Sequence, residues 1–255
     1  MLYSSMYPDL IKKFPNCKIE TEERLISLFK RSFGSEKKFV TFKAYSKNKK
    51  KINEFDKILY AGSLGKLFRN KLSSFPKKNF LIDDKSKTEQ MRKKIDKISN
   101  LKKIGLAWRS KREVIGEDKS ISLDILSSII NLKNFTFINL QYGDTKDEIV
   151  KFNKKNINKI YTINDLDLFN DFEAISSLLT NLDLFITVSN STAHLAGALG
   201  VPTWLIKPKN HALFHYWNQP NDKTPWYPSV KLFKYKGNWE ETITQIKKLL
   251  IKNFN

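Results

Sequence analysis

The sequence has almost no cysteine and lacks any long hydrophobic run. Cys17 is the one cysteine in 255 residues, so no disulfide can form within the chain, and a reducing compartment such as the cytoplasm is expected. No apolar stretch approaches the roughly 18 residues of a transmembrane helix, and the first residues lack the basic-then-apolar pattern of a signal peptide. These absences predict a cytoplasmic protein with no membrane span.

Arginine is also scarce, although the formal net charge is +20. Lysine supplies most of this charge, scattered along the chain among many Asn and Ile residues, as an A+T-rich genome would produce. Neither zinc-finger spacing nor an aromatic RNA-binding strand motif accompanies the lysines, so nucleic acid is not an expected partner. Nucleic-acid binding stays open as an alternative, which predicts a steep fall in affinity with salt. An anionic small substrate, such as a sugar nucleotide, would also suit a basic cleft.

The apolar pattern predicts an α/β fold with parallel strands. Hydrophobic residues make up 40% of the chain, which excludes a disordered polymer and allows one large or two modest domains. Short runs that are apolar on both faces alternate with helical patterns, as in a doubly wound sheet covered by helices. The predicted strands are 17–20, 38–42, 57–61, 80–82, 103–108, 136–140, 159–162, 184–188, 203–206 and 230–233.

One segment breaks this rhythm. Residues 83–101 have a sparse apolar stripe of Met91, Ile95 and Ile98 in a charged background, which is typical of a linker helix. We therefore expect three parts: an N-terminal Rossmann-like domain over 1–84, a linker helix over 85–101, and a C-terminal Rossmann-like domain over 102–255.

The stretch TVSNSTAHLAGALGVPTW, residues 187–204, predicts a strand, a turn and a helix. Asn190, or Ser189 before it, can cap the helix, whose first N–H groups and partial positive charge suit a phosphate. Ser191 and Thr192 add hydroxyls in the first turn, and His194 lies one turn in. The plain alternative is structural, because capped strand–turn–helix units are common in α/β proteins and a lone histidine is often part of the core.

Several motifs resemble those of one enzyme family. VSNSTAHLAGALGVPTW resembles the nucleotide-diphosphate segment of the heptosyltransferase-like glycosyltransferases, which are the family 9 enzymes and the related domains found behind tetratricopeptide repeats in bacteria. KIGLAWRS, DKSISLDIL, FINLQYGD and TPWYPSVKLF resemble further segments of that family in the same order. The resemblance covers about 103–250 and is weaker in the first hundred residues, where SSMYPDLI and ILYAGSLGKLFR carry it.

This resemblance implies a GT-B architecture, in which two Rossmann-like domains face a cleft. The C-terminal domain would bind a nucleotide-sugar donor and the N-terminal domain a glycan, lipid or protein acceptor, without a metal or another cofactor. The residues expected at the diphosphate are Asn190, Ser191, Thr192 and His194, together with Lys119, Arg109, Ser110 and Lys111. Those expected at the nucleotide or sugar are Trp108, Gln141 and Tyr142, and those on the acceptor side are Gly62 and Ser63.

The three histidines do not predict a metal site. His211 and His215 are four residues apart in HALFH and could share one face of a helix. A zinc site would need a third ligand and usually the glutamate of an HExxH motif, and the sequence offers neither.

The chain departs from the family pattern at two places. Ser189 and Asn190 stand where relatives often have Asp-Thr. The strand and glycine-rich acidic loop in which the catalytic base is expected do not precede the first helix, so the N-terminal domain is predicted to be incomplete and no catalytic residue is assigned. Three explanations stay open: a fragment of a longer protein, a misassigned start, or a domain that has lost catalysis.

Two functions follow from these observations. The first is an inverting, metal-independent glycosyltransferase. The second is a non-catalytic module that binds a sugar nucleotide or a glycan, as a fragment of a larger repeat protein.

Overall fold

The C-terminal part of the chain forms a seven-stranded sheet. The structure is a computed structural model that describes residues 1–42, 44, 53–110, 116–208 and 214–254. The strand order is β5-β4-β3-β6-β7-β9-β8, and every pairing is parallel except that of β8 with β9. The strands are β3 (Lys102–Ala107), β4 (Phe135–Asn139), β5 (Ile160–Tyr161), β6 (Leu184–Val188), β7 (Thr203–Ile206), β8 (Lys223–Thr224) and β9 (Tyr227–Phe233).

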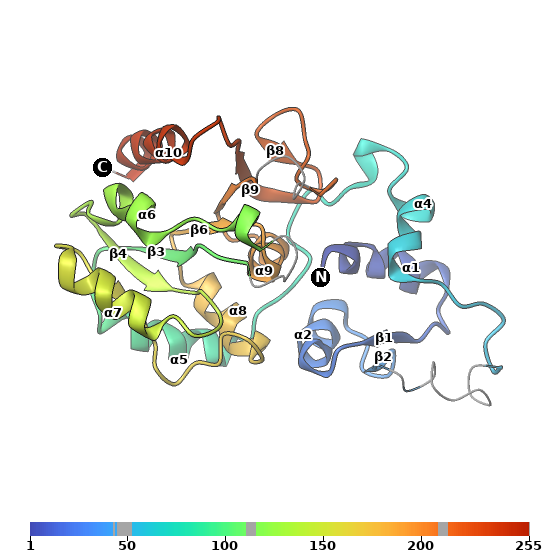
Figure 1. The fold of residues 1–255 in the computed structure, drawn as a ribbon. Helices are drawn as coiled ribbons and strands as arrows, with labels where there is room; N and C mark the ends of the chain where they lie inside the picture. Colours follow the sequence, from blue (N-terminus) through green and yellow to red (C-terminus); the bar gives the residue numbers. More distant parts are fainter. Residues whose placement is uncertain (43, 45–52, 111–115, 209–213, 255) are drawn as a thin grey trace.

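Helices cover both faces of this sheet (Figure 1). In β6, Leu184, Ile186 and Val188 pack on one face, while Phe185 packs on the other, so the strand is apolar on both sides as a buried parallel strand requires. The first face is covered by α6 (Leu123–Ile130), α7 (Lys146–Lys155) and α10 (Trp239–Phe254), and the second by α5 (Lys85–Asp96), α8 (Phe172–Thr180) and α9 (Ser191–Leu199).

The N-terminal part is smaller and contains a two-stranded parallel sheet of β1 (Ile19–Thr21) and β2 (Phe39–Thr41). Tyr7, Phe29, Phe33 and Phe39 form an aromatic cluster between α2 and these strands. The same buried cluster continues into α8 and α9, so the two parts share one continuous core. The remaining elements are η1 (Leu2–Met6), α1 (Tyr7–Lys13), α2 (Glu23–Phe33), η2 (Ala61–Leu64), α4 (Gly65–Phe68) and η3 (Leu72–Ser74).

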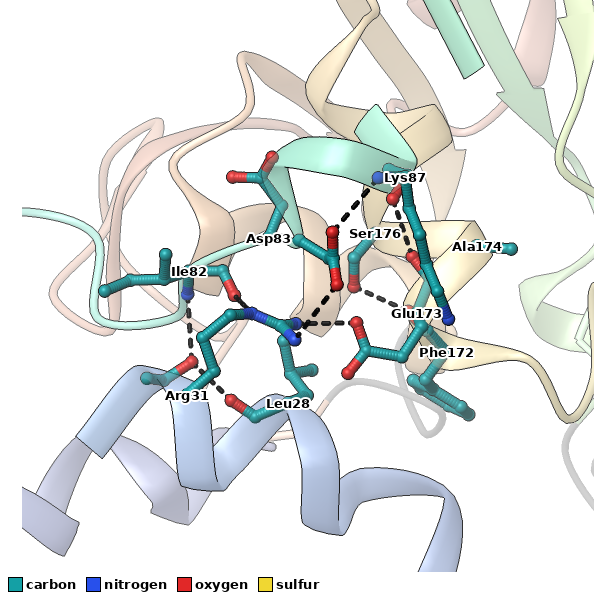
Figure 2. Close-up of polar contacts among 12 residues, drawn as sticks. Leu28, Arg31, Ile82, Asp83, Lys87, Phe172, Glu173, Ala174 and Ser176 are labelled. Carbon is teal, nitrogen blue, oxygen red and sulfur yellow. Dashed lines mark hydrogen bonds and ion pairs between the residues drawn. The ribbon is translucent and has the colours of Figure 1, made fainter. Parts of the chain in front are cut away.

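Helix α2 joins the N-terminal part to α8. Arg31 donates to Glu173 Oε2 at 2.6 Å and to the Ile82 carbonyl at 2.9 Å, and the Ile82 amide donates to Ser32 Oγ at 2.9 Å (Figure 2). The helix predicted over 85–101 ends as α5 at Asp96 and packs along α8 of the C-terminal part.

Two local predictions were wrong. The strand predicted over 57–61 does not form, and the side chains of Ile58, Leu59 and Tyr60 are exposed. Residues of β-forming type make a strand only where a neighbouring strand can pair with them. Residues 80–82 are extended but not paired in a sheet, and the amides of Phe80 and Leu81 donate to the carbonyl of Ala198.

Two strands predicted in the C-terminal part are confirmed with their bounds. The strands predicted over 184–188 and 203–206 have those bounds as β6 and β7. In addition, the structure shows that Ser122 caps α6 through its hydroxyl. Within the described part of the chain, no helix is both long enough and apolar enough to cross a bilayer.

Candidate functional site

The candidate site lies at the carboxyl edge of the large sheet. From β3 the chain proceeds to β4 and β5 on one side, and from β6 it proceeds to β7 and β9 on the other, so the strand order reverses between β3 and β6. In open α/β sheets, ligands bind beyond the carboxyl ends of the strands at such a switch point. The predicted residues after β3, β4 and β6 therefore share one edge of the sheet.

The start of α9 is capped by Asn190. Its Oδ1 accepts from the Ala193 amide at 2.9 Å, and its Nδ2 donates to Thr187 Oγ1 at 3.1 Å. The amides of Ser191 and Thr192 are the first two of the helix and have no helical carbonyl within reach. Ser191 is exposed to solvent, whereas Asn190 and Thr192 are buried. The helix therefore presents a positive dipole end and an exposed hydroxyl at the switch point.

Replacing Asn190 with alanine should lower the free energy of unfolding by about 1 kcal/mol, because the cap on Ala193 is lost. Asn190→Asp retains an oxygen that can cap the helix, so its free energy of unfolding should stay within a few tenths of a kcal/mol of the wild-type value. Urea unfolding followed by circular dichroism measures both variants. Equal losses in the two variants would mean that the cap is not what Asn190 contributes.

His194 is held in one orientation by aromatic neighbours. Its Nδ1 lies 2.9 Å from the Tyr227 hydroxyl, and its ring stacks on Trp217 with a centroid separation of 4.8 Å. Tyr216 contacts the ring edge to face, and the residue keeps part of its surface exposed. The contact with Tyr227 has no signal in the sequence, because it joins residues on α9 and β9, which only the folded sheet brings together.

Burial fixes the protonation of this pair. Desolvation, with nearby positive charges that include Lys119, lowers the pKa of His194 to about 3. Burial likewise raises the pKa of Tyr227 well above its ordinary value. Tyr227 therefore keeps its proton and the imidazole of His194 is neutral. In the tautomer in which the Tyr227 hydroxyl donates to Nδ1, the ring proton is on Nε2. His194 can donate a hydrogen bond from Nε2 but is not a base at neutral pH.

Lys119 and the segment 214–217 come together at this helix start. The Lys119 residue is 5% exposed, and its ammonium lies 4.4 Å from the centroid of the Phe214 ring. Trp217 Nε1 donates to Ser189 Oγ at 3.1 Å, so Ser189 anchors the segment and Asn190 alone caps the helix. A buried cation beside a helix N-terminus is a favourable setting for an anion.

The residues after β3 and β4 build the wall of the site. Gln141 Oε1 accepts from the amides of Trp108 and Arg109 at 2.9 and 2.7 Å. The Trp108 ring is buried in the core and its Nε1 donates to Glu148, and Arg109 pairs with Glu148 Oε2 at 2.8 Å. Trp108, Arg109 and Gln141 are thus held in place by contacts within the protein, and Gln141 also lines the cavity at this edge of the sheet.

Two further predicted residues, Ser110 and Tyr142, directly follow Arg109 and Gln141 in the chain, and a third lies outside the described residues. The Ser110 amide donates to Ser120 Oγ at 3.2 Å, which closes the loop that carries Lys119. The Tyr142 ring contacts that of Phe169, with centroids 6.1 Å apart. Lys111 falls outside the described residues.

A cavity of about 800 Å³ opens at the ends of β4 and β5. This volume is within the range of small-molecule sites, and the lining combines apolar and polar side chains as such sites do. No sequence pattern predicts the wall of this cavity after β5, because residues 163–169 have neither a glycine motif nor a regular apolar period. Among the lining residues are Gln141, Asp144, Thr162, Asn164, Leu168 and Phe169.

The predicted acceptor-side residues lie in the N-terminal part. Gly62 and Ser63 are exposed on η2, which packs on η1, and η1 in turn contacts α9. His215 is exposed, while His211 lies outside the described residues. Over the described ranges, no three His, Cys, Asp or Glu side chains gather as a metal site would require.

Comparisons with known proteins support the fold. No family model matches the chain. The chain is 28% identical over 265 residues to Protein FlbA of Caulobacter vibrioides, a match that covers 96% of the chain and 43% of that protein, so the chain spans less than half the length of this relative. It is similar to the structure of E. coli ADP-heptose lps heptosyltransferase II, with a TM-score of 0.63, 10% identity, and coverage of 98% and 95% of the two chains.

A third match is a glycosyl transferase family 9 structure from Veillonella parvula, with a TM-score of 0.48, 10% identity, and coverage of 69% and 47%. The similarity to the heptosyltransferase, together with the parallel sheet and its strand order, shows that the chain has a GT-B-like α/β fold.

Proposed function

We propose that this chain is a glycosyltransferase domain that binds a nucleotide-sugar donor at the carboxyl edge of its large sheet. The observation that carries the proposal is the start of α9, where two helix amides, an oriented neutral His194 and the buried Lys119 lie together. Such a constellation suits a diphosphate. The 800 Å³ cavity at β4 and β5 supplies room for the nucleoside.

The spacing of the two features supports this assignment. The cavity adjoins the ends of β4 and β5, and α9 follows β6, three strand positions from β5 in the order β5-β4-β3-β6. Neighbouring strands are about 4.8 Å apart, so the two features are separated by roughly 10–14 Å. An extended nucleoside diphosphate can bridge such a distance, with its base in the cavity and its phosphates at α9.

In the proposed reaction, a hydroxyl of a glycan, lipid or protein acceptor attacks the anomeric carbon of the donor sugar. The bond from that carbon to the diphosphate oxygen breaks, and its electron pair remains on the diphosphate. The acceptor hydroxyl gives up its proton to a base other than His194, such as solvent water. The helix amides, Lys119 and the Nε2–H of His194 stabilise the developing charge without a metal, and the configuration inverts. The acceptor would approach from the N-terminal part that carries Gly62 and Ser63, in a cytoplasmic setting consistent with the single cysteine.

A non-catalytic binding module is the second candidate, and one observation favours it. His194 has a pKa of about 3 and cannot take a proton from an acceptor at neutral pH. The deprotonating group must therefore come from elsewhere, or catalysis is absent. Under this second function the domain would hold a sugar nucleotide or a glycan within a larger protein, such as a tetratricopeptide-repeat protein.

Incubation with a panel of nucleotide sugars separates the two candidates. A glycosyltransferase releases nucleoside diphosphate, slowly by hydrolysis or faster with an acceptor, while a binding module retains the intact donor. Chromatography detects the released diphosphate, and calorimetry detects binding without release. If no nucleotide sugar of the panel is bound or cleaved, the glycosyltransferase and the module that binds a sugar nucleotide are both contradicted.

A further inference from the structure

The wall of the 800 Å³ cavity contains a turn that also borders a second cavity. Residues 167–171 separate the 800 Å³ cavity, lined by Leu168 and Phe169, from a second cavity of about 340 Å³, lined by Asn170 and Phe172. Asp167 lines both cavities. Leu168 packs against the core, whereas Phe169 is exposed, so the position of Phe169 depends on specific bonds.

The turn is well fixed within itself. Asp167 Oδ1 accepts from the amides of Phe169 and Asn170 at 2.8 and 3.0 Å, and Asp167 Oδ2 accepts from Asn170 Nδ2 at 2.9 Å. These bonds fix the shape of the turn and leave the Phe169 residue 56% exposed, with its ring in contact with the Tyr142 ring. They do not fix the turn relative to the rest of the cavity.

Arg24, on α2 of the N-terminal part, forms a hydrogen bond to this turn from outside it. Its Nη1 donates to the Phe169 carbonyl at 2.6 Å, and its guanidinium carbon lies 5.3 and 4.9 Å from the ring centroids of Phe169 and Phe172. Glu22 Oε2 accepts from Arg24 Nε at 2.6 Å and orients the guanidinium. One side chain of the N-terminal part therefore contacts both the backbone and the ring of a cavity-lining residue.

The position of Arg24 on α2 is itself secured. Arg24 and Arg31 are seven residues apart, which places them on the same face of the helix two turns from each other. Arg31 pairs with Glu173 in the first turn of α8 (Figure 2). The helix thus holds the start of α8 with Arg31 and the preceding turn with Arg24.

We propose that Arg24 is a positioning residue for the nucleotide base. By fixing Phe169 from the N-terminal part, it keeps an aromatic face in place against which the base of a nucleoside diphosphate stacks. This inference rests on the proposed function, because it assigns the cavity to the nucleoside. Since coupling is reciprocal, nucleotide binding also strengthens the docking of the two parts of the chain.

A comparison of two ligands tests this role. Inorganic pyrophosphate engages only the start of α9 and Lys119, whereas a nucleoside diphosphate also engages Phe169. We expect Arg24→Ala to weaken binding of the nucleoside diphosphate that binds wild type best by about three- to tenfold, the range of a cation–π contact at a partly exposed site. Pyrophosphate affinity should be unchanged, which a general loss of structure would not produce.

Three comparisons complete the calorimetric experiment on the full chain. Arg24→Lys keeps the charge and should recover part of the nucleotide affinity. Arg92→Ala removes an exposed arginine that pairs with Glu89 on α5 and should behave as wild type. Hydrogen exchange of residues 163–171 should be faster in Arg24→Ala than in wild type without any ligand.

The outcomes are distinct. Three results would each overturn the role of Arg24 and leave the proposed function intact. The first is equal affinity of wild type and Arg24→Ala for the nucleotide, and the second is a loss of pyrophosphate affinity in Arg24→Ala as large as its loss of nucleotide affinity. The third is unchanged hydrogen exchange at residues 163–171. No binding of any nucleoside diphosphate to wild type would instead overturn the proposed function, and this role with it.

Discussion

Acidification from pH 6.5 to pH 4 should cost the wild-type protein about 3 kcal/mol of stability that a His194→Gln variant does not lose. Burial lowers the pKa of His194 to about 3 in the folded protein, against 6.5 as the ordinary value. In this interval the unfolded chain binds a proton at His194 and the folded chain does not. The stabilisation is therefore fully present above pH 6.5 and declines as pH falls toward 3.

Urea unfolding of both proteins at several pH values measures the effect. Glutamine can still accept a hydrogen bond from the Tyr227 hydroxyl, so the variant should keep the wild-type fold. It should differ from wild type mainly in how steeply its free energy of unfolding changes with pH. His215→Gln, at an exposed histidine, is the matched control and should follow the wild-type slope. Parallel curves for wild type and His194→Gln would contradict the enclosure of the imidazole by its aromatic neighbours.

Arg31→Ala should lower the free energy of unfolding by about 2–3 kcal/mol, because a charged hydrogen-bond partner of a largely buried carboxylate is removed. The Glu173 side chain is 12% exposed, and within the described part of the chain its Oε1 already has no hydrogen-bond partner. Loss of Arg31 would leave the whole carboxylate without its cation, and would also remove the bond to the Ile82 carbonyl (Figure 2).

A second substitution identifies the cause of this loss. Glu173→Gln in the Arg31→Ala background removes the stranded charge and should recover part of the stability. Arg92→Ala, whose ion pair is exposed, should change stability by less than about 0.5 kcal/mol. An Arg31→Ala variant as stable as Arg92→Ala would show that α2 is not held to α8 by this contact.

The sequence was most informative where burial is complete and local. β6 and β7 are apolar on both faces, so their bounds follow from the run of apolar residues alone. The cap at Ser122 and the helix start after Asn190 follow from side chains that bond to amides two or three residues on. The α/β class follows from the alternation of such units, and the structure confirms it.

The sequence was least informative where residues distant in the chain meet. The apolar run at 57–60 has the composition of a strand, yet pairing needs a partner strand that the local sequence does not reveal. The contacts of Trp108 and Arg109 with Glu148 on α7 could not be predicted from the place of the two residues after β3. Neither the bond from Tyr227 to His194 nor that from Arg24 to Phe169 has a local signature.

The most direct test of the account is calorimetric titration of the chain with inorganic pyrophosphate and with nucleoside diphosphates. The account predicts saturable binding that Lys119→Ala weakens by about ten- to a hundredfold, since a charge-assisted hydrogen bond contributes about 1.5–3 kcal/mol. Lys252→Ala, at an exposed residue of α10, should leave the affinity unchanged. Absence of binding to wild type, or equal affinities of wild type and Lys119→Ala, would contradict a diphosphate site at the start of α9.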